Sequence, residues 1–157
     1  LWWTMSAFWV FLTTLNAITM LINNHKSTFD TFFIVGIIFW LTGFIIELVS
    51  DEQKRRFKMD PKNSEKFISS GLWSLSRHPN YFGEIVLWIG VAIMSLPTLV
   101  GIQFLSLVSP IFIYFLLTRI SGVNLLEERA NNKWGGQRDY KEYKFKTPVL
   151  IPFKKNK

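Results

Sequence analysis

The stretch SRHPNYFGE, residues 76–84, joins a polar, basic segment to a run of apolar residues. Pro79 suits the first turn of a helix, because its ring fixes φ near the helical value and its missing N–H would have no partner there. A helix that begins at Pro79 points its free N–H groups and positive dipole end back toward Arg77 and His78. Such helix ends attract anions, so the stretch predicts a helix start that can hold a negatively charged ligand.

Glu84 lies in the first turns of this helix and shares a face with Asn80, four residues earlier. A carboxylate is expensive in lipid, so Glu84 is expected to face protein or water and to have a partner. Two interpretations stay open. Glu84 belongs to a ligand site together with Asn80, or it forms a structural ion pair with Arg77 or Arg119.

Four apolar runs surround this stretch, at residues 1–22, 29–49, 81–100 and 102–118. Each is long enough to cross a bilayer, the last with tilt or local thinning. A soluble four-helix bundle would instead show a polar stripe every turn. The sequence therefore predicts an all-α polytopic membrane helix bundle of about four transmembrane helices, with a cytosolic helical loop and a C-terminal tail. We expect residues 1–157 to form a single membrane-embedded domain, the C-terminal part of a longer protein, because Leu1 already lies in an apolar run.

Composition narrows the function further. The chain has 157 residues, 49% hydrophobic content and no Cys, so disulfide and thiolate chemistry are excluded. With two His and no HExxH motif, no metal site is expected. The formal charge of +7 suits anionic membrane lipids or a phosphate-bearing ligand. Nucleic acid is not an expected partner, because the bases lie in two membrane-flanking segments that are also rich in acids.

Lys and Arg are distributed unevenly among the polar segments. The turn at 23–28 holds one, the segment at 50–80 holds seven, the turn after the third run holds none, and the tail from Arg119 holds ten. Four spans would place the two rich segments on the same side of the membrane. The positive-inside rule then makes the loop at 50–80 and the C-terminal tail cytoplasmic.

Nucleotide signatures such as GxGxxG after a strand or GxxxxGK[ST] do not occur. Any nucleotide cofactor would have to be held between helix ends and basic loops. A single juxtamembrane Lys is more often turned to lipid headgroups than to a ligand. Lipid does not require Asn, Glu or Asp, and this favours a site made of the following residues: Arg77, Asn80, Glu84, Arg138, Asp139 and Tyr143.

Several motifs resemble the steroid 5-alpha-reductase C-terminal family, and in particular its bacterial-type branch, DUF1295. These are GLW at 71–73, SRHPNYFGE at 76–84, WIG at 88–90, and the tail motifs LLE at 125–127, RDY at 138–140 with Tyr143, and TPVLIPF at 147–153. Ser50-Asp51 followed by Arg55 and Lys58 also fits the family pattern. The resemblance covers residues 36 to 154, and its most specific part is the NYFGE core.

This resemblance implies a membrane oxidoreductase that uses NADPH to reduce an activated carbon–carbon double bond in a lipid-like substrate of steroid or enone type. It places the cofactor region at about residues 47–153. Position by position, it implies cofactor contacts from Asp51, Arg55, Lys58, Lys66, Asn80, Glu84 and Tyr143, to which charge and placement add Arg77 and Arg138. The Tyr and Glu that polarise the substrate in steroid reductases lie on earlier helices, so the catalytic residues are unknown.

Two alternatives remain. The isoprenylcysteine carboxyl methyltransferases, which use S-adenosylmethionine (SAM), share an Arg-His-Pro-x-Tyr-x-Gly stretch, a Glu-Glu pair, here Glu127-Glu128, and a Tyr-x-x-Tyr, here Tyr140 and Tyr143. The NYFGE core and the Ser50-Asp51 segment favour the reductase. The third class is a membrane scaffold without enzymatic activity. The nucleotide that stabilises the protein discriminates among the three.

Overall fold

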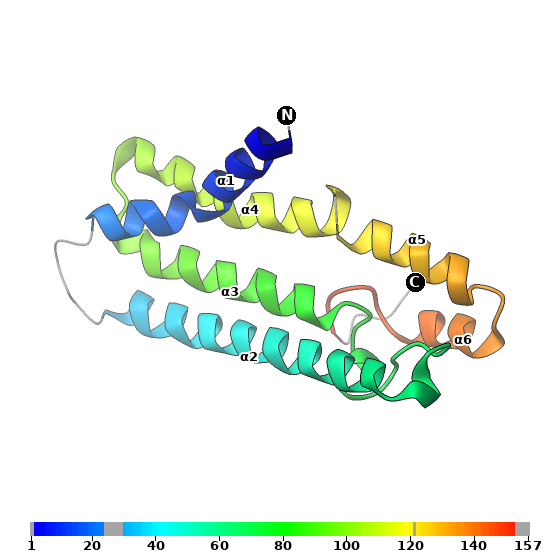
Figure 1. Ribbon diagram of the computed structural model, residues 1–157. Helices are drawn as coiled ribbons and strands as arrows, with labels where there is room; N and C mark the ends of the chain where they lie inside the picture. The colour runs from blue at the N-terminus through cyan, green and yellow to red at the C-terminus, as the bar shows by residue number, and fades with distance from the viewer. Residues whose placement is uncertain (1, 24–29, 121, 153–157) are drawn as a thin grey trace. The chain divides into compact units, whose positions relative to one another are not determined.

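The computed structural model describes residues 2–23, 30–120 and 122–152, with the side chains of residues 2–5 left out. The described residues form helices joined by turns and loops and contain no strand, which confirms the all-α prediction (Figure 1). Short 3-10 helices and one π-helix connect the longer elements. The α-helices of the described residues are α1 (Trp2–Asn23), α2 (Thr31–Met59), α3 (Pro79–Ser95), α4 (Val108–Phe115), α5 (Val123–Trp134) and α6 (Arg138–Lys146).

Among the described residues, four helical stretches are long and apolar enough to cross a membrane, and each overlaps one of the four apolar runs of the sequence. They are Ser6–Asn23, Thr31–Met59, Pro79–Thr98 and Gly101–Trp134. Their apolar side chains are largely outward-facing: Leu21 is 68% exposed and Ile38 is 56% exposed. Such exposure would be costly in water and is favourable in lipid. The protein is a polytopic helical membrane protein.

The fourth apolar run is not one regular helix. It begins as a 3-10 helix at Gly101–Leu107, continues as α4, and passes through a π-helix at Leu116–Ile120 before α5. Pro110 lies in the first turn of α4, where a missing N–H costs nothing. The expected fourth span is therefore confirmed, and its helical form changes from 3-10 to α and then to π along the run.

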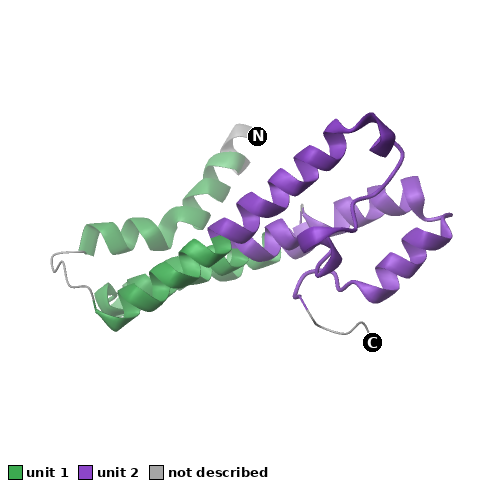
Figure 2. Cartoon of the chain, turned by 90° about the horizontal axis from the view of Figure 1, so that it is seen from below, with its two compact units in different colours: residues 1–43, 85–116 green, residues 44–84, 117–157 purple. Residues whose placement is uncertain are grey.

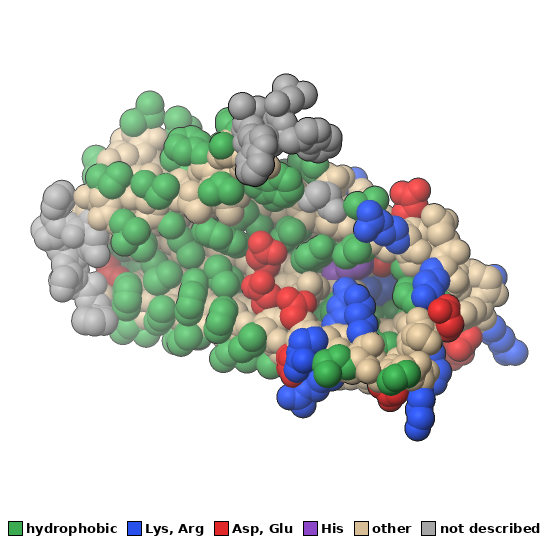
Figure 3. Space-filling view, in the orientation of Figure 1, with side chains coloured by type: hydrophobic (Ala, Val, Ile, Leu, Met, Phe, Trp, Pro, Cys, Tyr) green, Lys and Arg blue, Asp and Glu red, His purple; other side chains and the backbone are tan. Residues whose placement is uncertain are grey.

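Contacts divide the chain into two compact units, shown in Figure 2. Unit 1 comprises Leu1–Gly43 and Ile85–Leu116, and Figure 3 shows mainly hydrophobic side chains over it. Within unit 1, α2 and α3 approach closely at a pair of glycines. A Cβ added to Gly90 would lie 2.6 Å from Gly36 O and 2.6 Å from Trp40 N. Small residues permit this kind of backbone contact between membrane helices.

Unit 1 also contains a buried polar cluster around Asn16, which is 1% exposed. The Asn16 amide donates to Ser95 Oγ and Ser106 Oγ, both at 3.0 Å. The Ser109 hydroxyl donates to Leu12 O at 2.7 Å and accepts from the Asn16 backbone N–H at 3.1 Å. A side chain that enters the i→i−4 ladder bends a helix, and α1 changes direction along its length in Figure 1.

Unit 2 comprises Phe44–Glu84 and Leu117–Lys157 and carries the charged side chains that gather in Figure 3. As the sequence suggested, α2 continues beyond its apolar part, to Met59. The following loop returns along this extension. Trp73 Nε1 donates to Ser50 O at 3.0 Å, and the Leu72 N–H donates to Gln53 Oε1 at 3.0 Å. These bonds fix the loop that leads to the start of α3.

Candidate functional site

Unit 2 contains a cavity of about 290 Å³ between the end of α2, the loop before α3, α5 and α6. Six of its lining residues are basic, and no Asp or Glu from the described part of the chain joins them. The bases are Lys54, Lys58, Lys66, Arg77, Arg129 and Lys133. Arg77 and Lys133 have acidic partners outside the lining, Glu127 and Glu65, and the lining as a whole keeps an excess of positive charge. An excess of positive charge in a cavity attracts anions.

Aromatic rings form much of the remaining wall. The ring centroid of Phe67 lies 5.1 Å from that of Tyr140, 5.3 Å from that of Tyr143 and 6.1 Å from that of Trp134. Burial raises the pKa of the Tyr143 phenol, which therefore stays protonated and donates to Trp73 O at 2.7 Å. The wall is thus apolar, neutral and tied to the loop before α3.

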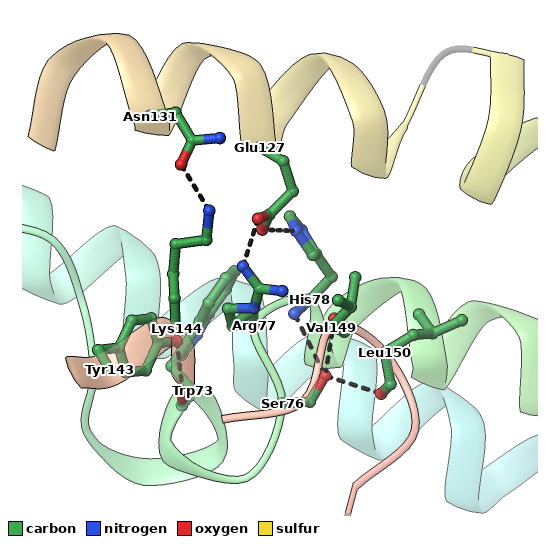
Figure 4. Close-up of polar contacts among 10 residues, drawn as sticks. All are labelled: Trp73, Ser76, Arg77, His78, Glu127, Asn131, Tyr143, Lys144, Val149 and Leu150. Atoms are coloured by element: carbon green, nitrogen blue, oxygen red, sulfur yellow. Dashed lines mark hydrogen bonds and ion pairs between the residues drawn. The ribbon is translucent and has the colours of Figure 1, made fainter. Parts of the chain in front are cut away.

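The three residues before Pro79 lie outside the helices and are held by hydrogen bonds to the C-terminal segment. Arg77 N–H donates to Pro148 O at 2.9 Å, and Ser76 Oγ donates to Leu150 O at 2.7 Å (Figure 4). The Ser76 hydroxyl also accepts from the His78 N–H at 3.2 Å. The C-terminal segment therefore fixes the backbone from which the Arg77 and His78 side chains extend.

Glu127, on α5, meets both of these side chains (Figure 4). One carboxylate oxygen pairs with Arg77 Nη1, and the other lies 2.8 Å from His78 Nε2. The Arg77 and His78 side chains are only 9% and 7% exposed. Arg77 Nε is buried and has no hydrogen-bond partner in the described chain, although the residue lines the cavity. A buried guanidinium with one donor unpaired is suited to an additional acceptor.

The structure brings four of the nine expected cofactor-binding residues to the wall of this cavity: Lys58, Lys66, Arg77 and Tyr143. The other five do not line it: Asp51, Arg55, Asn80, Glu84 and Arg138. Arg55 turns to Glu52, with Nε 2.6 Å from a carboxylate oxygen, on the exposed side of α2. Arg138 is exposed at the first turn of α6.

The prediction that Pro79 opens a helix is confirmed. Glu84 is partly buried in the second turn of α3, and the charged groups that act on it most are the carboxylates of Glu47 and Asp51. The ion pair suggested between Glu84 and Arg77 is not the one formed, because Arg77 pairs with Glu127.

The sequence did not single out His78, Glu127, Phe67 or Trp73 as site residues. Glu127 is 50 residues from Arg77 in the chain, and only its place in a Glu-Glu pair drew attention to it. Phe67 directly follows Lys66, which the sequence predicted as a cofactor contact. The sequence did not predict that the Phe67 ring forms part of the cavity wall. Spacing alone does not show contacts between segments so distant in the chain.

The spans and the cavity define a class: a polytopic helical membrane protein with a cationic, aromatic cavity in unit 2. The chain belongs to the family described as "Protein of unknown function (DUF1295)", whose profile matches residues 1–147. The resemblance inferred from the motifs is thereby confirmed.

Curated relatives include steroid reductases. The chain is 28% identical to rat 3-oxo-5-alpha-steroid 4-dehydrogenase 1, over 77% of this chain and 41% of the relative. It is 30% identical to steroid 5-alpha-reductase DET2 of Arabidopsis thaliana, again over 77% of this chain and 41% of the relative. It is 37% identical to the probable O-methyltransferase ustE of Ustilaginoidea virens, over 38% of this chain and 21% of the relative. The chain thus spans about two fifths of the length of these steroid-reductase relatives. No solved structure matches.

Proposed function

We propose that the protein acts as a membrane oxidoreductase that uses NADPH to reduce an activated carbon–carbon double bond in a lipid-like substrate of steroid or enone type. The observation that carries the proposal is the cavity of unit 2, with its six bases, aromatic wall and lack of acids among the described lining residues. The named activities of the steroid-reductase relatives support the reaction class.

The cavity suits the phosphates of a dinucleotide on grounds of charge. NADPH carries a pyrophosphate and a 2′-phosphate, which require several bases at hydrogen-bonding distance. Arg77, Lys58 and Lys66 all line the cavity and contribute positive charge from the segment before α3, from α2 and from the loop that follows α2. Bound NADPH supplies the hydride, while the protein binds and orients it. The other expected contacts, from Asp51, Arg55, Asn80, Glu84 and Arg138, stay predictions.

A SAM-dependent methyltransferase is the second candidate, favoured by the local similarity to ustE. Its cofactor carries a sulfonium, an ammonium and a carboxylate group, so its net charge is positive, and it has no phosphate. Six bases without a lining acid would repel those cations, whereas they attract a polyanion. The charge of the cavity therefore supports NADPH over SAM.

We further propose that the loop at 50–80 and the C-terminal tail face the cytoplasm, where NADPH would reach the cavity. The substrate would enter from the lipid, and the cofactor region would extend over about residues 47–153 of a single membrane-embedded domain. The uneven distribution of Lys and Arg supports this orientation.

The test is the thermal stability of the full chain in detergent with NADPH, NADH or SAM added at equal concentrations. A ligand that binds the folded state at about 100 times its Kd stabilises it by about 2.7 kcal/mol. We expect a clear upward shift of Tm with NADPH, a smaller shift with NADH and none with SAM. Stabilisation by SAM alone would replace the proposal with the methyltransferase.

A further inference from the structure

Glu127 brings a negative charge to the edge of a cavity whose lining is otherwise basic. Its carboxylate contacts two residues of that lining, Arg77 and His78, and is 19% exposed. A carboxylate beside a site for phosphates costs Coulomb repulsion when the phosphates bind. Glu127 must therefore make a favourable contribution to binding that offsets this repulsion.

Both oxygens of Glu127 are engaged, one by each partner. A free Arg side chain loses rotamer entropy when it binds a ligand. Here the contact at Nη1 holds the guanidinium in place before binding. Arg77 Nε stays buried without a partner in the described chain, and the backbone N–H of Arg77 is held by Pro148 O.

From this geometry we infer that Glu127 is a positioning residue: it fixes Arg77 and His78 so that they bind a phosphate group, and this ordering outweighs its own repulsion. The inference rests on the proposed function, because it assigns the phosphate to the dinucleotide. It makes Glu127 part of the binding machinery although its charge has the sign of the ligand.

The direction in which Glu127→Gln changes NADPH affinity separates a positioning role of Glu127 from a purely electrostatic one. If Glu127 acted only through its charge, Glu127→Gln would make the cavity more positive and tighten NADPH binding. If Glu127 instead positions Arg77 and His78, Glu127→Gln should bind NADPH more weakly. Glu128→Gln is the matched control, because Glu128 is the next residue, is exposed and loses the same charge. We expect Kd for NADPH to rise about tenfold in Glu127→Gln, a change of about 1.4 kcal/mol, and to stay near the wild-type value in Glu128→Gln.

A double-mutant cycle tests whether Glu127 acts through Arg77. In an Arg77→Ala background, Glu127→Gln should change NADPH affinity little, because the group that it positions has been removed. An undiminished effect in that background, or tighter binding by the single variant, overturns the inference. If Glu127→Gln does not fold, Glu127→Asp takes its place: it keeps the charge but withdraws the carboxylate, so unchanged affinity would likewise overturn positioning.

Inorganic pyrophosphate, used as a second probe, separates this inference from the proposed function. A protein that binds pyrophosphate but not NADPH refutes the proposed cofactor, and Glu127 is then judged on pyrophosphate affinity by the same criteria. Binding of neither probe by the folded wild-type protein would overturn both.

Discussion

Lys58 and Arg56 lie two residues apart on α2, yet their side chains have different surroundings. Lys58 lines the cavity, whereas Arg56 is 76% exposed and pairs with Glu52 at 2.6 Å. Lys58→Ala should weaken NADPH binding roughly tenfold and NADH binding much less, because NADH lacks the 2′-phosphate. Arg56→Ala removes an equal charge from the outside and should have little effect. Titrations of both variants with both nucleotides check this, and equal effects would assign the result to net charge alone.

Glu84 differs from Lys58 in its electrostatic surroundings, because the charged groups that act on it are the like-charged carboxylates of Glu47 and Asp51. Replacing its charge relieves repulsion, so Glu84→Gln should fold with an undiminished Tm. Under the cofactor proposal this variant, and likewise Asn80→Ala, should bind NADPH at least about tenfold more weakly. Tm and NADPH affinity are measured on the same preparations. A destabilised Glu84→Gln that binds NADPH normally would remove Glu84 from the cofactor site.

At the scale of elements, the crossing of α2 and α3 in unit 1 depends on Gly36 and Gly90. A methyl group at Gly90 would meet backbone atoms at 2.6 Å, which flexible side chains cannot relieve. Gly90→Ala should therefore lower stability by about 1–3 kcal/mol, the usual cost of overpacking. Gly136→Ala is the control, because nothing lies within 4 Å of its added Cβ. Thermal unfolding in detergent compares the two, and equal Tm values would contradict the close crossing.

The helices also show which features of the fold can be predicted from the sequence. Hydropathy gave the four spans, and Pro79 gave the start of α3, because both signals are local. The changes of helical form around α4 were not foreseen, since 3-10 and π turns leave no separate periodicity in an apolar run. The pairing of Glu127 with Arg77 was not foreseen either, because it depends on how α5 packs in unit 2. Residues of the site that carry charge were named more readily than those that orient them.

At the scale of the whole molecule, the distribution of Lys and Arg predicts the topology. Lys66 should be accessible from the cytoplasmic side and Lys26 from the opposite side; Lys26 and Lys154 lie outside the described residues. Because the chain has no Cys, single Cys substitutions at these three positions can be labelled without background. With an impermeant reagent we expect positions 66 and 154 to label together and position 26 to label from the other side. Labelling of positions 26 and 66 from the same side would rule out four spans.

The hydroxyl of Ser109 bonds to the backbone of α1 at both Leu12 O and the Asn16 N–H. The curvature of α1 is therefore encoded partly in a residue of α4, more than ninety positions away. The α1 segment by itself contains neither Pro nor Gly that would bend it. Synthesised alone as a peptide in lipid, it should be a straighter rod, and it would acquire its native shape only when α4 docks. Unit 1 thus acquires part of its architecture late in assembly, after its last helix has entered the membrane.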